Sequence, residues 1–178
     1  MHAIEGLIRD LIGFIDEDAL REGLYETPKR VSGFYQEFLD HRHPLQMTVF
    51  DSEGMDEMII QQGIPFYSLC EHHLLPFFGT ATIAYIPNGK VLGLSKFSRV
   101  LDHFARKITI QERITHQVSE YLMNVLSPKG VAVSLKARHL CLEMRGIERT
   151  GSSTITNFLL GAFRDDPRSR AEFMELIK

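Results

Sequence analysis

Two long segments with the composition of β-strands surround a short loop that carries a cysteine and two histidines. Residues 57–69 and 77–87 are rich in isoleucine, phenylalanine, tyrosine and threonine, and LCEHHLLPF separates them. Residues of these types fit the pleated, half-buried surface of a sheet. Residues 131–144 and 153–163 have the same character. The sequence therefore predicts four long strands, the first two joined by a loop with the residues of a functional site.

Helices are predicted before, between and after these strands. They cover residues 3–19, 28–41, 95–107 and 110–126, and a short one begins at about residue 167. Apolar residues recur at spacings of three and four in the amphipathic ones, Pro28 suits a first helical turn, and Ser95 is a candidate N-cap. The order of elements indicates an α+β fold, with an antiparallel four-stranded sheet and helices on one face.

The chain is expected to divide into two regions. The helical pattern is lost between residues 42 and 56, which predicts a connecting stretch, and Asn88-Gly89 predicts a turn. We expect an N-terminal helical region over residues 1–50 and one structural unit over residues 51–178. Four long strands leave two long sheet edges, and exposed edges tend to pair with other chains. We therefore expect the edges to join neighbouring subunits in a ring or barrel.

Charge and composition exclude several classes of protein. The net charge of −3 over 178 residues argues against nucleic acid as a partner, because phosphate backbones select basic surfaces. No apolar run is long enough to span a bilayer, and the first residues carry acids where a signal peptide carries basic residues. These features predict a cytoplasmic protein without a membrane partner, in which the two cysteines stay reduced.

Both cysteines lie beside histidines. Cys70 and His73 are three residues apart in the loop, so a thiolate and an imidazole can reach one ion. If residues 131–144 form a strand, His139 and Cys141 share one of its faces, with Cα atoms roughly 6–7 Å apart. Three ligands, Cys70, His73 and Cys141, with water in the fourth position would form a catalytic zinc site. His72 and His139 would then remain free to move protons.

Two other interpretations of these residues stay open. Each cysteine can be a small buried apolar residue, the usual fate of an intracellular thiol. Alternatively the zinc can be structural, with either His72 or His139 as a fourth ligand.

A second group of residues has the chemistry to bind a nucleotide. Ser95, Lys96 and Arg99 lie at the start of a predicted helix, where backbone donors attract phosphate, and Arg145 adds a charge near the metal residues. Gln111 and Glu112 open the next helix. A carboxylate there can accept from the amide and amine of guanine, although the helix dipole alone also favours an acid. Ser95, Lys96 and Arg99 can likewise be an ordinary capped, solvated helix start.

The ordered set of these motifs resembles the GTP cyclohydrolase I family. The motifs are GLYETPKRV at 23–31, CEHHLLPFFG at 70–79, AYIP at 84–87, GLSK at 93–96 followed by Arg99, QER at 111–113, HLC at 139–141 and MRG at 144–146. The likeness implies a zinc hydrolase that converts GTP and water to formate and 7,8-dihydroneopterin triphosphate, the entry to folate or other pterins. It also implies a tunnelling-fold catalytic domain in a toroidal homodecamer, with active sites shared between subunits.

The resemblance assigns a role to each matching residue. Cys70, His73 and Cys141 would be the zinc ligands, and His72 and His139 would take part in purine opening, with His139 as acid to the imidazole nitrogen while water attacks carbon 8. Ser95 and Lys96 match groups near the ribose and triphosphate, Arg99 and Arg145 match phosphate-binding arginines, and Gln111 with Glu112 matches the guanine-recognition pair.

Two positions depart from the pattern of the family motifs. Thr109 stands where many members have glutamine, and Lys136 stands where an acid is common; neither is an expected ligand.

One alternative is a non-catalytic, zinc-stabilised oligomer that binds nucleotides. The other is a related tunnelling-fold enzyme that acts on another purine or pterin.

Overall fold

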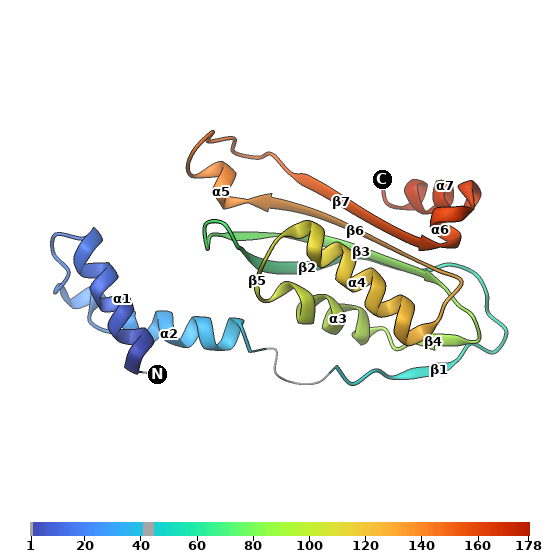
Figure 1. The fold of residues 1–178 in the computed structure, drawn as a ribbon, viewed down its shortest axis with the longest axis horizontal. Helices are drawn as coiled ribbons and strands as arrows, with labels where there is room; N and C mark the ends of the chain where they lie inside the picture. Colours follow the sequence, from blue (N-terminus) through green and yellow to red (C-terminus); the bar gives the residue numbers. More distant parts are fainter. Residues whose placement is uncertain (1, 41–44) are drawn as a thin grey trace. The chain divides into compact units, whose positions relative to one another are not determined.

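An antiparallel sheet lies at the centre of the larger unit in the computed structural model, which describes residues 2–40 and 45–178 (Figure 1). The strand order is β5-β2-β3-β6-β7, and neighbours are antiparallel except the short β5, which runs parallel to the end of β2. The bounds are Ile59–Cys70 for β2, Pro76–Ile86 for β3, Ile108–Thr109 for β5, Gly130–His139 for β6 and Thr154–Gly161 for β7. The four long strands of the sequence prediction are confirmed, and β5 was not predicted.

Alternate side chains of the central strands point to opposite faces of the sheet. Ile83 of β3 pairs with Val133 of β6, and both are fully buried in the larger apolar core. The next pair, Ala84 with Ala132, faces the other way and packs in a smaller cluster. This alternation follows from the two-residue period of a strand, and it gives the sheet an apolar surface on both sides.

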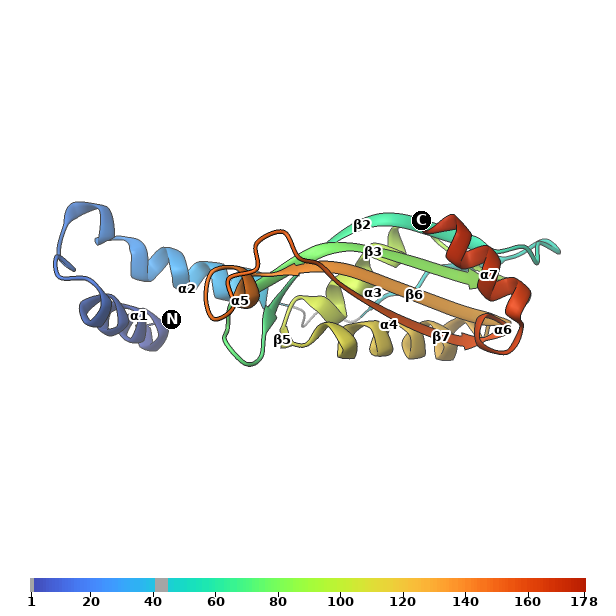
Figure 2. The same ribbon diagram turned by 90° about the horizontal axis from the view of Figure 1, so that it is seen from above.

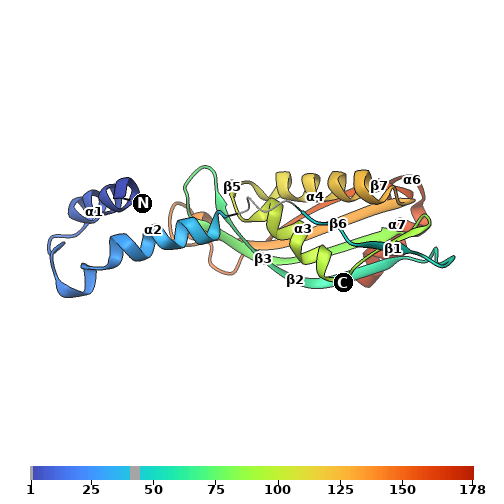
Figure 3. The same ribbon diagram turned by 90° about the horizontal axis from the view of Figure 1, so that it is seen from below.

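Helices α3 (Ser95–Ala105) and α4 (Gln111–Leu126) lie side by side on one face of the sheet (Figure 2 and Figure 3). The buried stripe of α4 consists of Ile114, Val118, Leu122 and Leu126, and burying each of these side chains stabilises the fold by about 1.5–3 kcal/mol. Ser95 is not the N-cap of α3. That position is held by Leu94 in a helical conformation without a side-chain cap, so Ser95 is already inside the helix.

The opposite face carries a second, smaller group of helices. β7 ends at Gly161, whose φ of 56° suits glycine and whose position leaves no room for a side chain, because a Cβ would lie 2.3 Å from the carbonyl oxygen of Lys129. The chain therefore turns into α6 (Ala162–Asp165), although residues 162 and 163 were predicted as strand. α7 (Pro167–Leu176) then lies on this face (Figure 2), and its Phe173 packs beside Phe163.

The predicted connecting stretch contains a strand. Val49–Asp51 forms β1, which pairs with β4 (Lys90–Leu92) just after the turn at Asn88-Gly89. The prediction failed because three residues carry too little periodicity to be distinguished from a loop. Residues 42–44 of the predicted stretch, and residue 41 of the predicted second helix, lie outside the described residues.

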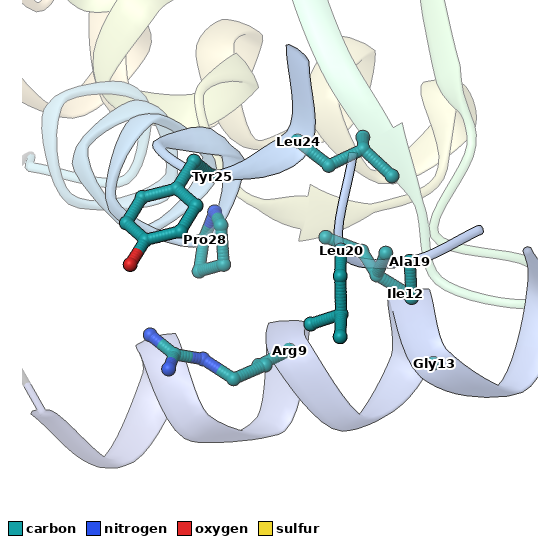
Figure 4. Close-up of a pocket in the computed structure, with 8 residues that line it drawn as sticks. All are labelled: Arg9, Ile12, Gly13, Ala19, Leu20, Leu24, Tyr25 and Pro28. Atoms are coloured by element: carbon teal, nitrogen blue, oxygen red, sulfur yellow. The ribbon is translucent and has the colours of Figure 1, made fainter. Parts of the chain in front are cut away.

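The N-terminal unit is built from two helices joined by a turn. α1 (His2–Ile15) ends earlier than predicted, because the Asp16 carboxylate accepts from the Asp18 backbone (3.1 Å) and from Arg21 (2.5 Å), which favours a turn. A 3-10 turn, η1 (Glu22–Leu24), leads into α2 (Thr27–Phe38). The two helices and the turn enclose a pocket of about 320 Å³, with Arg9 opposite Tyr25 and Pro28 (Figure 4).

The chain divides into residues 1–43 and 44–178. The division lies before residue 50, the boundary expected from the sequence, because Leu45, Met47 and Val49 pack against the larger core. Among the described residues, no helix combines a bilayer-spanning length with an apolar sequence.

Candidate metal and nucleotide site

Cys70 and His73 lie in the tight turn that joins β2 to β3. The carbonyl oxygen of Cys70, the last residue of β2, accepts from the backbone N–H of Leu74 (2.8 Å) and, more weakly, of His73 (3.3 Å). Leu74 closes the turn with a φ of 56°, a left-handed conformation that is uncommon for leucine. The Sγ atom of Cys70 lies 3.8 Å from Nδ1 of both His72 and His73. The turn thus places a buried thiol next to two exposed imidazoles.

Cys141 reaches the same place by a route that the sequence did not predict. β6 ends at His139, and Leu140–Glu143 forms a single helical turn, α5, so Cys141 does not share a strand face with His139. The side chain of Arg138 pairs with Glu143 across this change of direction (2.5 and 2.8 Å). The ligand atoms of Cys70, His73 and Cys141 all lie within 4.8 Å of one another. The fold therefore brings the predicted set of three together; these residues are called the metal group below.

The chemistry of this group fits a zinc ion. Burial raises the pKa of the Cys141 thiol, and the neighbouring Cys70 raises it further. Burial and a neighbouring sulfur both disfavour the thiolate form, and a bound cation would stabilise both thiolates. Two sulfurs and an imidazole nitrogen are donors that zinc prefers, at about 2.3 Å and 2.0–2.1 Å. Within the described residues this group of three includes neither His72 nor His139.

His139, two residues before Cys141, is half-buried, and one face and one nitrogen of its ring have partners. Its ring stacks on Phe77, its cross-strand neighbour, with centroids 4.8 Å apart and planes 3° from parallel. Its Nε2 lies 2.9 Å from Oε1 of Gln111. Burial lowers the pKa of His139, and the negative charge of Glu112 acts in the opposite direction. The His139 imidazole is therefore neutral at physiological pH, and the charge of Glu112 favours its protonated form.

Gln111 is buried, in contrast to the prediction that it faces a nucleotide. Its side chain is 1% exposed, and its amide nitrogen donates to the carbonyl oxygens of Leu135 (3.0 Å) and Thr154 (3.1 Å) and to the hydroxyl of Thr156 (3.1 Å). Glu112, the next residue, is exposed. The two members of the predicted base-binding pair thus have different surroundings.

Arg145 lies beside the metal group. Its Nη1 is 2.7 Å from Nε2 of His73 and, because a guanidinium only donates, the imidazole nitrogen accepts. Arg145 is exposed, so its remaining donors face solvent. A positive charge therefore lies next to His73.

Ser95, Lys96 and Arg99 lie at the other end of the sheet. The start of α3 is fixed near Tyr85: the Tyr85 hydroxyl accepts from the backbone of Leu92 (2.8 Å), and its ring lies 5.9 Å from that of Phe97. Tyr85 is eight residues along β3 from Phe77, which packs on His139, a separation of roughly 25 Å at strand geometry. Within one chain these three residues are therefore not brought to the metal group.

The chain matches the sequence model of a known protein family. The model for GTP cyclohydrolase I matches residues 4–178. The chain belongs to the GTP cyclohydrolase I family. The match includes the loop with Cys70 and His73 and the turn with Cys141, and it agrees with an α+β sheet of the tunnelling-fold type.

Relatives in the GTP cyclohydrolase I family match nearly the whole chain. GTP cyclohydrolase 1 of Sulfurihydrogenibium sp. is 50% identical over 98% of this chain and 93% of its own length, and that of Wolinella succinogenes is 44% identical over 99% and 96%. The bifunctional protein FolKE of Lactococcus lactis is 43% identical over 97% of this chain, which spans about half (51%) of that relative. An archaeosine synthase QueF-Like structure aligns with 58% of the chain and 93% of its own, at a TM-score of 0.47 and 18% identity, a likeness too remote to bear on function.

In this GTP cyclohydrolase I family member, an ion pair that the sequence did not predict holds the turn between β2 and β3, called the metal loop below. Glu71 lies between Cys70 and His72, and its carboxylate accepts from both terminal nitrogens of Arg113, one of them at 3.3 Å. The guanidinium holds the pKa of Glu71 below its ordinary value. The same loop is tied by the backbone N–H of Glu71 to the carbonyl of Thr109 (3.1 Å). The nearness of QER and CEHH arises only from the pairing of β2 with β5, so no sequence pattern signals this contact.

Proposed function

We propose that the chain is a zinc-dependent GTP cyclohydrolase I, which opens the imidazole ring of GTP with water, releases formate and yields 7,8-dihydroneopterin triphosphate, a first step toward folate or other pterins. The observation that carries the proposal is the convergence of Cys70, His73 and Cys141 beside the half-buried His139 in a chain of this family. A hydrolytic site needs this division between residues that hold a metal and residues that move protons.

In this proposal Cys70, His73 and Cys141 hold zinc. When bound, zinc supplies a Lewis acid that makes water nucleophilic near neutral pH. The protein contributes the shape and the dryness of the site, because both sulfurs are buried while His73 lies at its surface.

His139 and His72 handle protons in the proposed reaction. His139 is neutral before substrate arrives, since burial lowers its pKa, and nearby Glu112 favours the imidazolium that it needs in order to donate. It protonates the imidazole nitrogen of the purine as water attacks carbon 8. His72, exposed and 3.8 Å from Cys70, is placed to exchange protons with solvent.

Recognition of GTP is assigned to polar and charged groups from two ends of the fold. Arg145 contacts His73, and the charge of Glu112 acts on His139, so at this end of the fold they would bind a phosphate and the guanine edge. Ser95, Lys96 and Arg99 would bind the ribose and triphosphate, yet they lie roughly 25 Å away within one chain. We therefore assign these three residues to the site of a neighbouring copy.

A ring of subunits would bring the two ends together. The strand β7 and most of β2 are edges of the sheet within a chain, and open edges pair readily with other chains. We propose a homodecamer of joined sheets with active sites between copies. Two free thiols in a metal group suit the reducing cytoplasm.

Formate release from GTP, followed together with the fluorescence of the oxidised pterin, tests the proposal. Zinc-loaded protein should form formate and pterin in equal amounts. Zinc-loaded protein that binds GTP tightly but leaves the purine absorbance unchanged would instead support a non-catalytic nucleotide-binding oligomer. Turnover of another purine or pterin in place of GTP would indicate a related tunnelling-fold enzyme.

A further inference from the structure

We propose that Gln111 is a positioning residue that sets the tautomer of His139, and that it does not read the guanine base. The inference rests on the proposed function of His139 as a proton donor. It assigns to Gln111 the task of holding the proton of the neutral imidazole on Nε2, so that Nδ1 is the nitrogen left to exchange a proton with substrate.

The orientation of the Gln111 amide is decided by its buried partners. One end of the amide faces the carbonyl oxygens of Leu135 on β6 and Thr154 on β7, at 3.0 and 3.1 Å. Carbonyl oxygens only accept, so this end is the NH2 group. A flipped amide would place its oxygen against two other oxygens in a buried site, which is costly. The oxygen of Gln111 must therefore face His139.

The tautomer of His139 follows from that orientation. An amide oxygen only accepts, and it lies 2.9 Å from Nε2 of His139, so Nε2 carries the hydrogen. In a neutral imidazole the other nitrogen, Nδ1, is then unprotonated. The described residues supply no hydrogen-bond partner for Nδ1. A proton taken up by His139 is consequently placed on the nitrogen that faces away from Gln111.

Phe77 restricts the ring to this arrangement. The two rings are stacked, with centroids 4.8 Å apart and planes only 3° from parallel, and Phe77 is 1% exposed. A partial rotation of the imidazole would break the stack, whereas a half-turn would keep the stack but replace Nε2 with a ring carbon and so break the bond to Gln111. The stack thus holds the plane of the ring, and the hydrogen bond distinguishes its two edges.

Base recognition is left to Glu112. Gln111 uses both ends of its amide inside the fold, whereas the side chain of Glu112 is exposed. A group whose donors and acceptor are all committed has none left for a ligand. The adjacent positions therefore have separate tasks, one toward the catalytic imidazole and one toward the substrate.

The tautomer is measured directly by solid-state nitrogen-15 NMR on the full, zinc-loaded protein labelled at histidine, at about pH 8.5 where neutral rings dominate. The His139 signals are assigned by their loss in His139→Asn. We expect a protonated Nε2 and a bare Nδ1 in the wild-type protein. The reverse pattern in the wild-type protein would overturn the proposal, even if every variant failed to fold.

Kinetics of Gln111→Met separate positioning from base reading. We expect kcat for GTP to fall by at least about tenfold, since general acid catalysis contributes about 10²–10⁴-fold. KM should change little, and so should the preference for GTP over inosine triphosphate, which lacks the 2-amino group. A rise in KM with loss of that preference, at unchanged kcat, would show that Gln111 reads the base.

Gln117→Met is the matched control, because it makes the same change on the same helix. The Oε1 of Gln117 is buried without a partner, so kcat and the His139 signals should stay as in the wild type. The NMR measurement needs no substrate. If wild-type protein shows the expected tautomer but releases no formate from GTP, the proposed function fails while the role of Gln111 stands.

Discussion

Cys141 and His139 are two residues apart, and the structure gives them different partners. Cys141 turns toward Cys70 and His73 on the helical turn α5, whereas His139 stays on β6 and bonds to Gln111. The change from strand to helix between them separates the proposed metal ligand from the proposed proton donor. Substitutions at the two positions should therefore have different consequences.

Cys141→Ala should lose both bound zinc and GTP turnover, because two ligands hold a zinc ion far less tightly than three. His139→Ala should keep about one zinc per chain and lose purine opening, with kcat lower by about 10²–10⁴-fold. Metal analysis of each purified variant, with formate release from GTP, checks both. Loss of zinc from His139→Ala would mean that His139 is a ligand and the site structural.

The metal loop is also held by α4 and β5, which are distant from it in the sequence and adjacent to it in the folded chain. Glu71 is held by Arg113 from the first turn of α4 and by the backbone of Thr109 in β5. Groups that orient metal ligands without touching the metal typically influence affinity by about 10–100-fold. The ion pair is partly exposed, so its contribution lies in orienting the loop rather than in stabilising the whole fold.

Arg113→Leu should weaken zinc binding about tenfold. The loop then loses the side chain that fixes Glu71, while all three ligands remain present. Competition with a chelator of known affinity measures the change. Arg106→Leu is the control, since it removes another partly exposed ion pair, with Asp102 in α3, and should leave zinc affinity unchanged. Equal effects of the two variants would contradict the proposed role.

The start of α7 provides a pH-dependent contact. The Asp166 carboxylate caps the helix by accepting from the backbone N–H of Arg168 (2.9 Å), and the Arg168 side chain holds the pKa of Asp166 below its ordinary value. A lowered pKa means that this stabilisation is complete above the unfolded-state pKa, about 3.9. It is lost as the pH falls through the lower folded-state pKa.

Asp166→Ala should lower the melting temperature by about 2–4 °C at pH 7, because an N-cap is lost. The difference from wild type should shrink as the pH falls below about 4. Thermal unfolding followed by circular dichroism over this range measures it. A difference that stays constant with pH would show that the charge of Asp166 is not involved.

At the scale of the whole molecule, the two halves of the proposed site lie at opposite ends of one sheet. His139 and the metal group adjoin the Phe77 end of β3, and the start of α3 adjoins the Tyr85 end. No rotation of side chains closes a gap of roughly 25 Å. The proposed site would therefore be complete only with a second copy of the chain.

Co-expression of Lys96→Ala and His139→Ala chains should restore activity that neither variant has alone. A site that takes its metal half from the Lys96→Ala chain and its phosphate half from the His139→Ala chain has no defect. Random assembly of equal amounts should give about a quarter of the wild-type turnover. The check is formate release by co-purified, differently tagged chains. An inactive mixed assembly would place both halves of the site in one chain.

Much of the fold could be predicted because its signals are local. The apolar stripe of α4 and the β-branched composition of the long strands each fix an element within a few residues. The short strands β1, β4 and β5 could not be predicted, since two or three residues form a strand only when a distant partner is present. The helical turn at Cys141 was missed for a related reason: the strand pattern of β6 continues in the sequence beyond the point where the chain turns.

The sequence by itself determined which residues carry the chemistry, because thiols, imidazoles and arginines are visible as residue types at fixed spacings. Only the tertiary structure decided how the tasks are divided among them. Gln111 and Glu112 look like a pair in the sequence, and the fold buries one behind His139 and exposes the other. Burial and hydrogen-bond partners are set by contacts between residues far apart in the chain, and such contacts exist only once the strands have paired.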